Sequence, residues 1–84
     1  MYVAGIDVGS EMTKAAIVGP QGLVATARVP TEFDVEATAQ QVLQDVLKAG
    51  GLERDAVGYL VATGTGVTWV SGADQKVTEI VAAA

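Results

Sequence analysis

Apolar residues gather in three short segments over the first thirty positions of the chain. These segments occupy residues 2–8, 12–18 and 23–29. Turn-forming residues separate them, with Gly9-Ser10 after the first and Gly19-Pro20-Gln21-Gly22 after the second. Apolar runs of this length bounded by Gly, Pro and Ser are typical of β-strands joined by tight turns. The pattern predicts an antiparallel meander of three strands, closed by Pro30.

The apolar spacing then changes to that of a helix. Apolar residues recur every three or four positions at Val35, Ala39, Val42, Leu43, Val46 and Leu47. Asp34 precedes this stripe as a predicted N-cap, and Glu36 stands in the first turn, where the helix dipole favours a carboxylate. Lys48 lies in the last turn, and Gly50-Gly51 supplies a left-handed stop. The segment predicts one amphipathic helix with a single buried face.

A fourth strand pattern follows the helix at residues 56–62. Because a helical crossover leads to it, we expect this strand to run parallel to the first. The loop Thr63-Gly64-Thr65-Gly66 follows at its carboxyl end, where ligands of open α/β sheets bind. Residues 67–70 predict a short extended piece.

The end of the chain predicts a second helix. Asp74 would be its N-cap, and one face would carry Val77, Ile80, Val81 and Ala84. Neither glycine, proline nor a basic residue stops this helix by Ala84, so we expect the 84 residues to be part of a longer chain. Half of the residues are hydrophobic, which is rich for a domain that buries only about 60% of its surface. Apolar strands that need cover on both faces would explain this richness.

Composition narrows the chemistry. The chain has neither cysteine nor histidine, so thiolate ligands and the commonest general base are absent from it. Its net charge is −5 and its five basic residues are scattered, which argues against a nucleic-acid partner. No apolar run approaches the roughly 20 residues of a membrane span, and the start has no leader pattern. We therefore expect a cytoplasmic protein without a membrane partner.

The segment 5–14 is the candidate for chemistry. Its predicted turn carries the carboxylate of Asp7, the flexible Gly9, the hydroxyl of Ser10 and, after a gap, the ammonium of Lys14. Glycine lets a backbone approach a ligand closely and present its N–H groups. A carboxylate beside such a turn can hold hydrated Mg²⁺, and a lysine can neutralise phosphate charge. The hypothesis is a phosphate-binding hairpin for a nucleotide.

The Asp7-Val8-Gly9-Ser10 turn resembles the first phosphate motif of the actin-like ATPase superfamily, which includes acetate and sugar kinases and actin. The later motifs are similar to those of benzoyl-CoA reductase ATPase subunits and 2-hydroxyacyl-CoA dehydratase activators. They are Val61 to Gly66, Ala73-Asp74 and Val77-Thr78-Glu79-Ile80. The resemblance implies that residues 1–84 are a partial N-terminal lobe with an actin-like, ribonuclease H-like α/β fold. That lobe would hold a mixed sheet of three antiparallel strands, a crossover helix and a parallel fourth strand.

The family couples ATP hydrolysis to delivery of a low-potential electron to an acyl-CoA reductase or dehydratase. The resemblance implies a [4Fe–4S] cluster between two ATPase subunits, in a homo- or heterodimer, with its ligands beyond these residues. Asp7 would position Mg²⁺ through water, while Gly9 and Ser10 would cradle the β- and γ-phosphates. Lys14 would sit close by, and Thr63-Gly64 would lie near the nucleotide cleft.

Five positions refine this interpretation. Glu79 could orient the hydrolytic water if its helix faced the cleft. Glu11 stands where the family has a small residue or Thr, and it would weaken phosphate binding unless its side chain pointed away. Thr65 and Val67 replace a Tyr and an Arg common in the activators, and a residue near Ala83 replaces a His. These departures favour a relative of the reductase subunits.

Two other functions stay open on the sequence. The same phosphate turn would serve a small-molecule kinase of the sugar or acetate type. Alternatively, Glu11 and the high apolar content favour a non-enzymatic module for subunit contact that has lost ATP binding. In every reading residues 1–84 form only one side of a nucleotide cleft, so we do not expect them to hydrolyse ATP alone.

Overall fold

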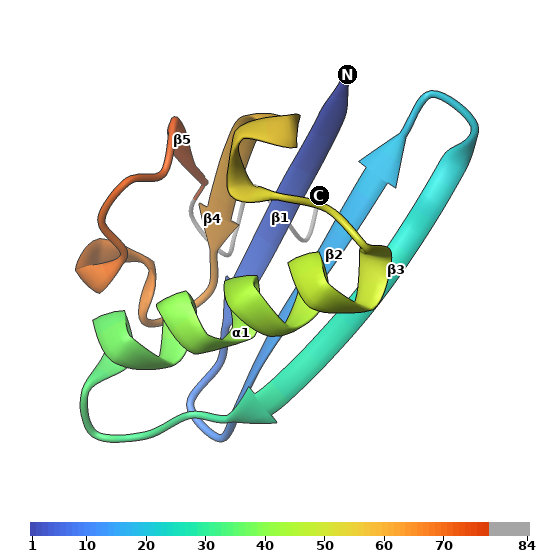
Figure 1. Cartoon of the computed structure of the whole chain (residues 1–84). Coiled ribbons are helices and arrows are strands. Elements are labelled where there is room, and N and C mark those ends of the chain that lie inside the picture. The colour runs from blue at the N-terminus through green and yellow to red at the C-terminus, as the bar shows by residue number, and fades with distance from the viewer. Residues whose placement is uncertain (78–84) are drawn as a thin grey trace.

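A computed structural model describes residues 1–77 of the chain (Figure 1). Its five strands are β1 (Tyr2–Val8), β2 (Met12–Gly19), β3 (Gly22–Pro30), β4 (Val57–Thr63) and β5 (Gln75–Val77). The helices are α1 (Val35–Gly50) and two 3₁₀ turns, η1 (Arg54–Ala56) and η2 (Val67–Trp69). The strands form one sheet in the order β3-β2-β1-β4-β5, so the first strand lies at its centre.

The pairing confirms the predicted mixed sheet. Strands β1, β2 and β3 form an antiparallel meander, and β4 pairs with the free edge of β1 in parallel. The parallel pairing follows from α1, which carries the chain from one edge of the meander to the other side of β1. As a result, the carboxyl ends of β1 and β4 meet at the same edge of the sheet.

Helix α1 begins and ends where its capping residues predict. The Asp34 carboxylate accepts a hydrogen bond from the Ala37 N–H at 3.0 Å, which satisfies one of the free donors of the first turn. Gly51 closes the helix with a φ of 67°, and its N–H donates to the Lys48 carbonyl. No helix within residues 1–77 is long and apolar enough to cross a membrane.

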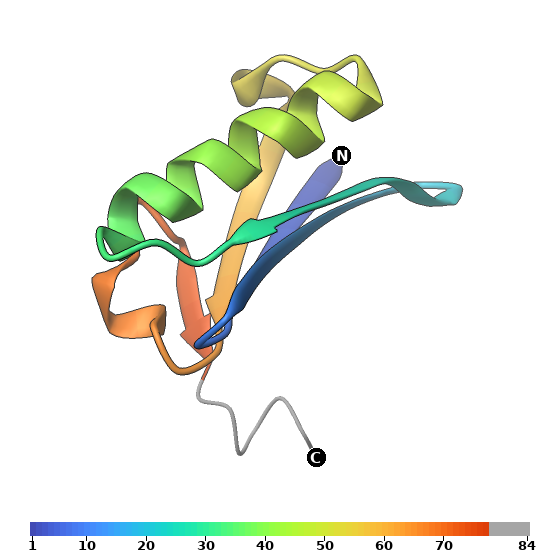
Figure 2. The same cartoon turned by 90° about the horizontal axis from the view of Figure 1, so that it is seen from below.

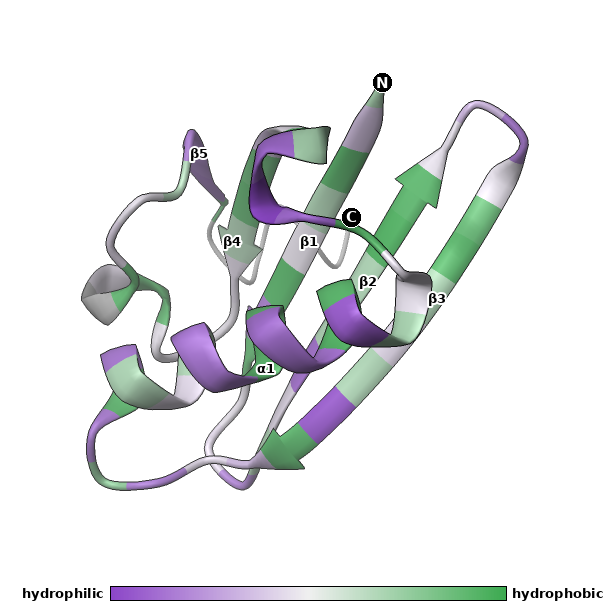
Figure 3. Cartoon of the chain, viewed as in Figure 1, coloured by the Kyte–Doolittle hydropathy of each residue, from purple (hydrophilic) through white to green (hydrophobic). Residues whose placement is uncertain are grey.

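The core lies between α1 and one face of the sheet. Figure 2 shows the helix laid over that face, and Figure 3 shows apolar positions along the central strands. The apolar stripe of α1 is buried there against Ala4, Ile6, Val8, Ala15 and Ile17 of β1 and β2. Inward residues alternate with outward ones along β1 and β2, which is the strand period of two.

The opposite face of the sheet is open within the described residues. Val18 and Leu23 are 47% and 67% exposed at one end of this face, and Asp7, Lys14 and Arg28 are exposed at the other end. Parallel strands such as β1 and β4 normally have cover on both faces. Here the helix covers only one face of the sheet. This agrees with the expectation that the chain has more apolar residues than these residues can bury by themselves.

Two predicted segments near the end of the chain are wrong. Residues 67–69 form the 3₁₀ turn η2, closed by the Val70 N–H on the Val67 carbonyl at 3.2 Å, and are not extended. The helix predicted to start at Asp74 is replaced by strand β5, which pairs in parallel with β4. The rest of that predicted helix, residues 78–84, lies outside the described residues.

Asp74 explains why a strand begins where a helix was expected. Its carboxylate accepts from the Leu60 N–H at 2.7 Å, and its own N–H donates to the Leu60 carbonyl at 2.8 Å. Both backbone groups of Leu60 are therefore satisfied at the outer edge of β4. An aspartate that caps the edge of a strand cannot also cap a helix in the chain direction.

We expect Asp74→Ala to loosen this edge. The Leu60 N–H would lose its charged acceptor, a loss that costs about 1–3 kcal/mol when the donor is shielded from water. Hydrogen exchange of the Leu60 amide should accelerate accordingly, whereas the exposed Asp55→Ala control should leave it unchanged. Equal exchange rates in both variants would show that the carboxylate contributes nothing to the pairing.

Candidate functional site

The turn between β1 and β2 is narrow and closed by its own backbone. The Gly9 N–H donates to the Met12 carbonyl at 3.0 Å, and a Cβ at Gly9 would lie only 2.7 Å from that carbonyl oxygen. Only glycine fits such a close approach without a shift of the backbone. Ser10 and Glu11 stand exposed at the tip of the turn, so the Ser10 hydroxyl is accessible to a ligand.

The side-chain hydroxyls of two threonines fix the backbone of this turn through hydrogen bonds. The Thr31 hydroxyl donates to the Gly9 carbonyl at 2.9 Å and lies 2.7 Å from the hydroxyl oxygen of Thr13, which is fully buried. Since a hydroxyl has one proton, Thr13 must be the donor to Thr31. The Thr31 N–H also donates to the Glu11 carbonyl at 2.8 Å. The turn therefore has its carbonyls fixed at two points.

Sequence reasoning missed both threonines, although one signal pointed to them. Thr13 occupies an inward position of β2 in step with Ala15 and Ile17, where every other side chain is apolar. A buried hydroxyl needs a partner inside the protein. The identity of that partner depends on how residue 31 returns to the hairpin, which no local pattern shows.

The loop after β4 packs directly on the end of β1. The Val8 carbonyl accepts from the Gly66 N–H at 3.1 Å and from the Thr65 hydroxyl at 3.3 Å. Gly64 has a φ of 100°, and a Cβ there would lie 2.7 Å from an oxygen of Asp7. The structure therefore places Thr63-Gly64 directly beside Asp7 and the end of β1. A side chain at position 64 would push the carboxylate away.

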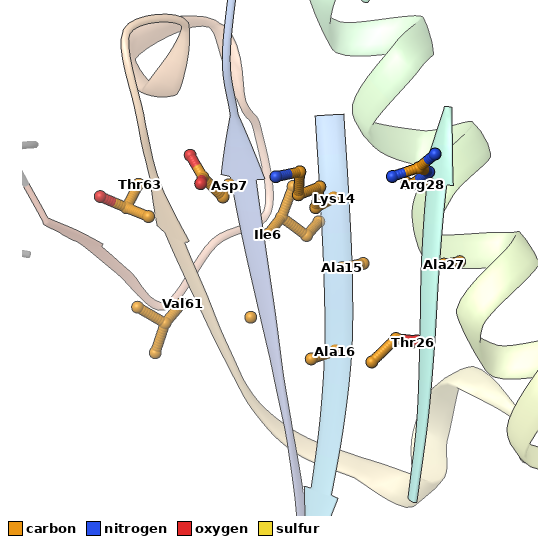
Figure 4. Close-up of a pocket in the computed structure, with 11 residues that line it drawn as sticks. Ile6, Asp7, Lys14, Ala15, Ala16, Thr26, Ala27, Arg28, Val61 and Thr63 are labelled. Atoms are coloured by element: carbon orange, nitrogen blue, oxygen red, sulfur yellow. The ribbon is translucent and has the colours of Figure 1, made fainter. Parts of the chain in front are cut away.

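Four polar side chains form a row across the open face of the sheet (Figure 4). The register pairs Thr63 with Asp7, Asp7 with Lys14, and Lys14 with Arg28 on adjacent strands. They line one open hollow of about 640 Å³, together with small residues such as Ala16. Sequence analysis selected Thr63, Asp7 and Lys14 for this site but missed Arg28.

The other predicted residues line a neighbouring hollow. Gly9 and Ser10 line this hollow together with Thr65 and Gly66 of the loop after β4 and with residues that lead into α1. The volume of the hollow is about 460 Å³. The end of β1 thus separates two hollows, with the carboxylate and ammonium in one and the turn backbone in the other. Glu79 lies outside the described residues.

The row suits a magnesium ion that keeps several water ligands better than one bound entirely by protein side chains. The Thr63 hydroxyl oxygen is buried and has no hydrogen-bond partner within residues 1–77, and Asp7 beside it is exposed. Mg²⁺ keeps several waters and takes one or two carboxylates plus phosphate oxygens. No group of three metal-binding side chains occurs in the described part of the chain. An iron–sulfur cluster does not fit these residues, because the sequence has no cysteine.

The chain is similar in sequence and fold to proteins that act with acyl-CoA dehydratases. The activator of lactoyl-CoA dehydratase from Anaerotignum propionicum is 35% identical over 80 residues, which are 95% of this chain and 31% of that protein. Component A of the (R)-2-hydroxyglutaryl-CoA dehydratase of Acidaminococcus fermentans matches with a TM-score of 0.85 and 27% identity, over 95% of this chain and 31% of that one. No protein-family model matches the chain.

Two further structures extend the comparison. The activator of the 2-hydroxyisocaproyl-CoA dehydratase from Clostridium difficile, solved with bound ADPNP, has a TM-score of 0.82 and 29% identity over 95% of this chain and 30% of that one. Xylulose kinase from Rhodospirillum rubrum has a TM-score of 0.64 and 25% identity over 76% of this chain and 16% of that one.

The fold is therefore that of the actin-like ATPases, as the opening turn and the order of elements predict. Within that superfamily the chain is a relative of the 2-hydroxyacyl-CoA dehydratase activators. It spans 31% of the length of the curated relative it matches.

We expect Thr31→Val to destabilise the turn. Valine has nearly the same shape but cannot donate to Gly9, and it leaves the buried Thr13 hydroxyl unpaired, which costs about 1–3 kcal/mol. Urea unfolding of the intact protein should show this loss, and Thr31→Ser should recover most of it. Thr26→Val is the matched control on the exposed face of β3. If both valine variants unfold alike, the hydroxyl pair does not stabilise the turn.

Proposed function

We propose that this chain is the ATP-binding lobe of an ATPase that activates an acyl-CoA dehydratase or reductase. The observation that carries the proposal is the pairing of Asp7 with Lys14 beside a glycine turn, at the edge where the loop after β4 meets β1. The likeness to dehydratase activators, one of them solved with ADPNP, supports a nucleotide as the ligand. In this proposal, ATP hydrolysis drives transfer of a low-potential electron.

The roles follow from chemistry and position. We assign Asp7 to the water shell of Mg²⁺ and Lys14 to the negative charge of the phosphates. The Ser10 hydroxyl and the N–H groups at the tip of the turn, beyond that of Gly9, would bind phosphate oxygens, and Thr63-Gly64 would border the nucleotide. Bound Mg²⁺ would supply charge neutralisation for the leaving phosphates. Phosphoryl transfer needs mainly such positioning and electrostatic stabilisation.

These residues provide one wall of a cleft, and the proposal needs a second wall. ATP binding would close the two walls, and partner proteins would respond to that closure. We propose a second ATPase subunit and a dehydratase or reductase component as those partners, in the cytoplasm. The [4Fe–4S] cluster of such an assembly would take its cysteines from outside residues 1–84. Glu79 remains our candidate for orienting the attacking water.

Specific observations favour three alternatives. Thr65 and Val67 depart from the loop of the activators, which favours a partner of the benzoyl-CoA reductase type, while the relatives favour a dehydratase. The structural likeness to xylulose kinase supports a small-molecule kinase, but with a lower TM-score than the activators have. Glu11, exposed at the tip of the turn, favours a contact module without ATP.

Isothermal titration of the intact protein with MgATP tests the proposal. We expect binding in the wild type and a loss of about tenfold or more in affinity for Lys14→Gln, because a hydrogen bond to a charged group contributes about 1.5–3 kcal/mol. Lys48→Gln, in the exposed last turn of α1, is the matched control and should bind normally. A wild type that gives no heat would leave only the contact module.

Asp7→Asn separates the metal from the nucleotide. Without Mg²⁺ the variant should bind ATP at least as tightly as the wild type, because removing the carboxylate relieves its repulsion from phosphate. With Mg²⁺ the wild type should gain affinity and the variant should gain much less. Asp55→Asn, exposed in the turn η1 before β4, is the control. An equal Mg²⁺ response in both variants would remove Asp7 from the metal site.

A further inference from the structure

We propose that Arg28 is a second cationic contact for the nucleotide polyphosphate, next to Lys14 on the open face of the sheet. The proposal rests on the proposed function, since it assumes a nucleotide beside Asp7. Arg28 lies directly opposite Lys14 in the pairing of β2 with β3, and both side chains are exposed and line the same hollow (Figure 4).

The placement is unfavourable without a ligand. Like charges that face each other across neighbouring strands destabilise a sheet. The chain carries only five basic residues against ten acidic ones, yet two of the five are in direct opposition here. An anion bound between Lys14 and Arg28 would turn this repulsion into attraction. Phosphate is the anion that we propose for the neighbouring turn.

The negative charge of Asp7 can offset the positive charge of Lys14 but not that of Arg28. It lies one strand from Lys14 but two strands from Arg28, and strands are about 4.8 Å apart, so Asp7 and Arg28 are separated by about 10 Å of sheet. In the row across the sheet, Arg28 therefore has only a cation as its neighbour. A guanidinium presents a planar fork of donors that matches phosphate oxygens, whereas lysine acts as a point charge.

A β-bulge brings Arg28 to this position. Near the turn, Gly19 pairs with Gly22 and Val18 with Leu23, but Ile17 pairs with Ala25, so Val24 is the additional residue. If Val24 instead paired regularly with Ile17, Lys14 would face Ala27, and Arg28 would face the inward Thr13 on the core side of the sheet. Bulges often re-aim a side chain next to a functional site. Here the bulge places a guanidinium beside the proposed phosphates.

Titrations of the intact protein with MgATP, ADP and AMP test the assignment. We expect Arg28→Gln to weaken MgATP about tenfold, Arg28→Lys to weaken it less, and both to leave AMP binding unchanged. Lys48→Gln should match the wild type throughout. In urea without nucleotide, Arg28→Gln should unfold at the same or a higher concentration, because the repulsion from Lys14 is gone. A merely structural arginine would shift this midpoint downward.

Each other outcome overturns the assignment. If the wild type binds MgATP and Arg28→Gln binds it equally well, Arg28 does not contact the polyphosphate and the proposed function still stands. If AMP weakens as much as MgATP, the arginine acts on the fold or on the nucleoside. If only the association with a partner subunit weakens, Arg28 pairs with an acidic side chain of that partner. If the wild type binds no nucleotide, the proposed function fails together with this inference.

Discussion

The pairing of β1 on both of its edges is the constraint on which the rest of the molecule depends. Antiparallel pairing with β2 creates the tight turn at Gly9, and parallel pairing with β4 brings the loop at Gly64 to the same end of β1. Val8 then accepts two hydrogen bonds from that loop, so the two segments hold each other in place. A carboxylate at position 7 is the last outward side chain before this junction. Its location is therefore a property of the sheet and not of a flexible loop.

The contacts that fix the turn between β1 and β2 come in part from residues outside it. The hydroxyls of Thr13 and Thr31 join the hairpin to the connection that leads into α1, and the cap at Asp34 starts that helix a few residues later. The position of α1 and the position of the turn are thus coupled through a short backbone segment. A movement of the helix relative to the sheet would reach the turn through Thr31. This coupling suits a lobe whose ligand is proposed to drive closure.

Most of the architecture could be predicted from local patterns because each pattern has one physical reading. The stripe from Val35 to Leu47 with its two caps admits only a helix, and a crossover helix admits only a parallel fourth strand at this site. The strand β5 could not be predicted, because three residues have no period of their own and depend on Asp74 reaching back to Leu60. The hydrogen bonds of the Thr31 hydroxyl could not be predicted either, because their partners, Gly9 and Thr13, are distant in the sequence.

By itself the sequence determined the order of the elements from β1 to β4, the ends of α1 and the residues Asp7, Gly9, Ser10 and Lys14 of the candidate turn. These depend on backbone preferences and spacing that act over a few residues. The tertiary structure alone decided the register between neighbouring strands, and hence the row from Thr63 through Asp7 and Lys14 to Arg28. One additional residue in β3 sets which side chain faces Lys14, because a shift of one position in a strand reverses the face of every side chain beyond it.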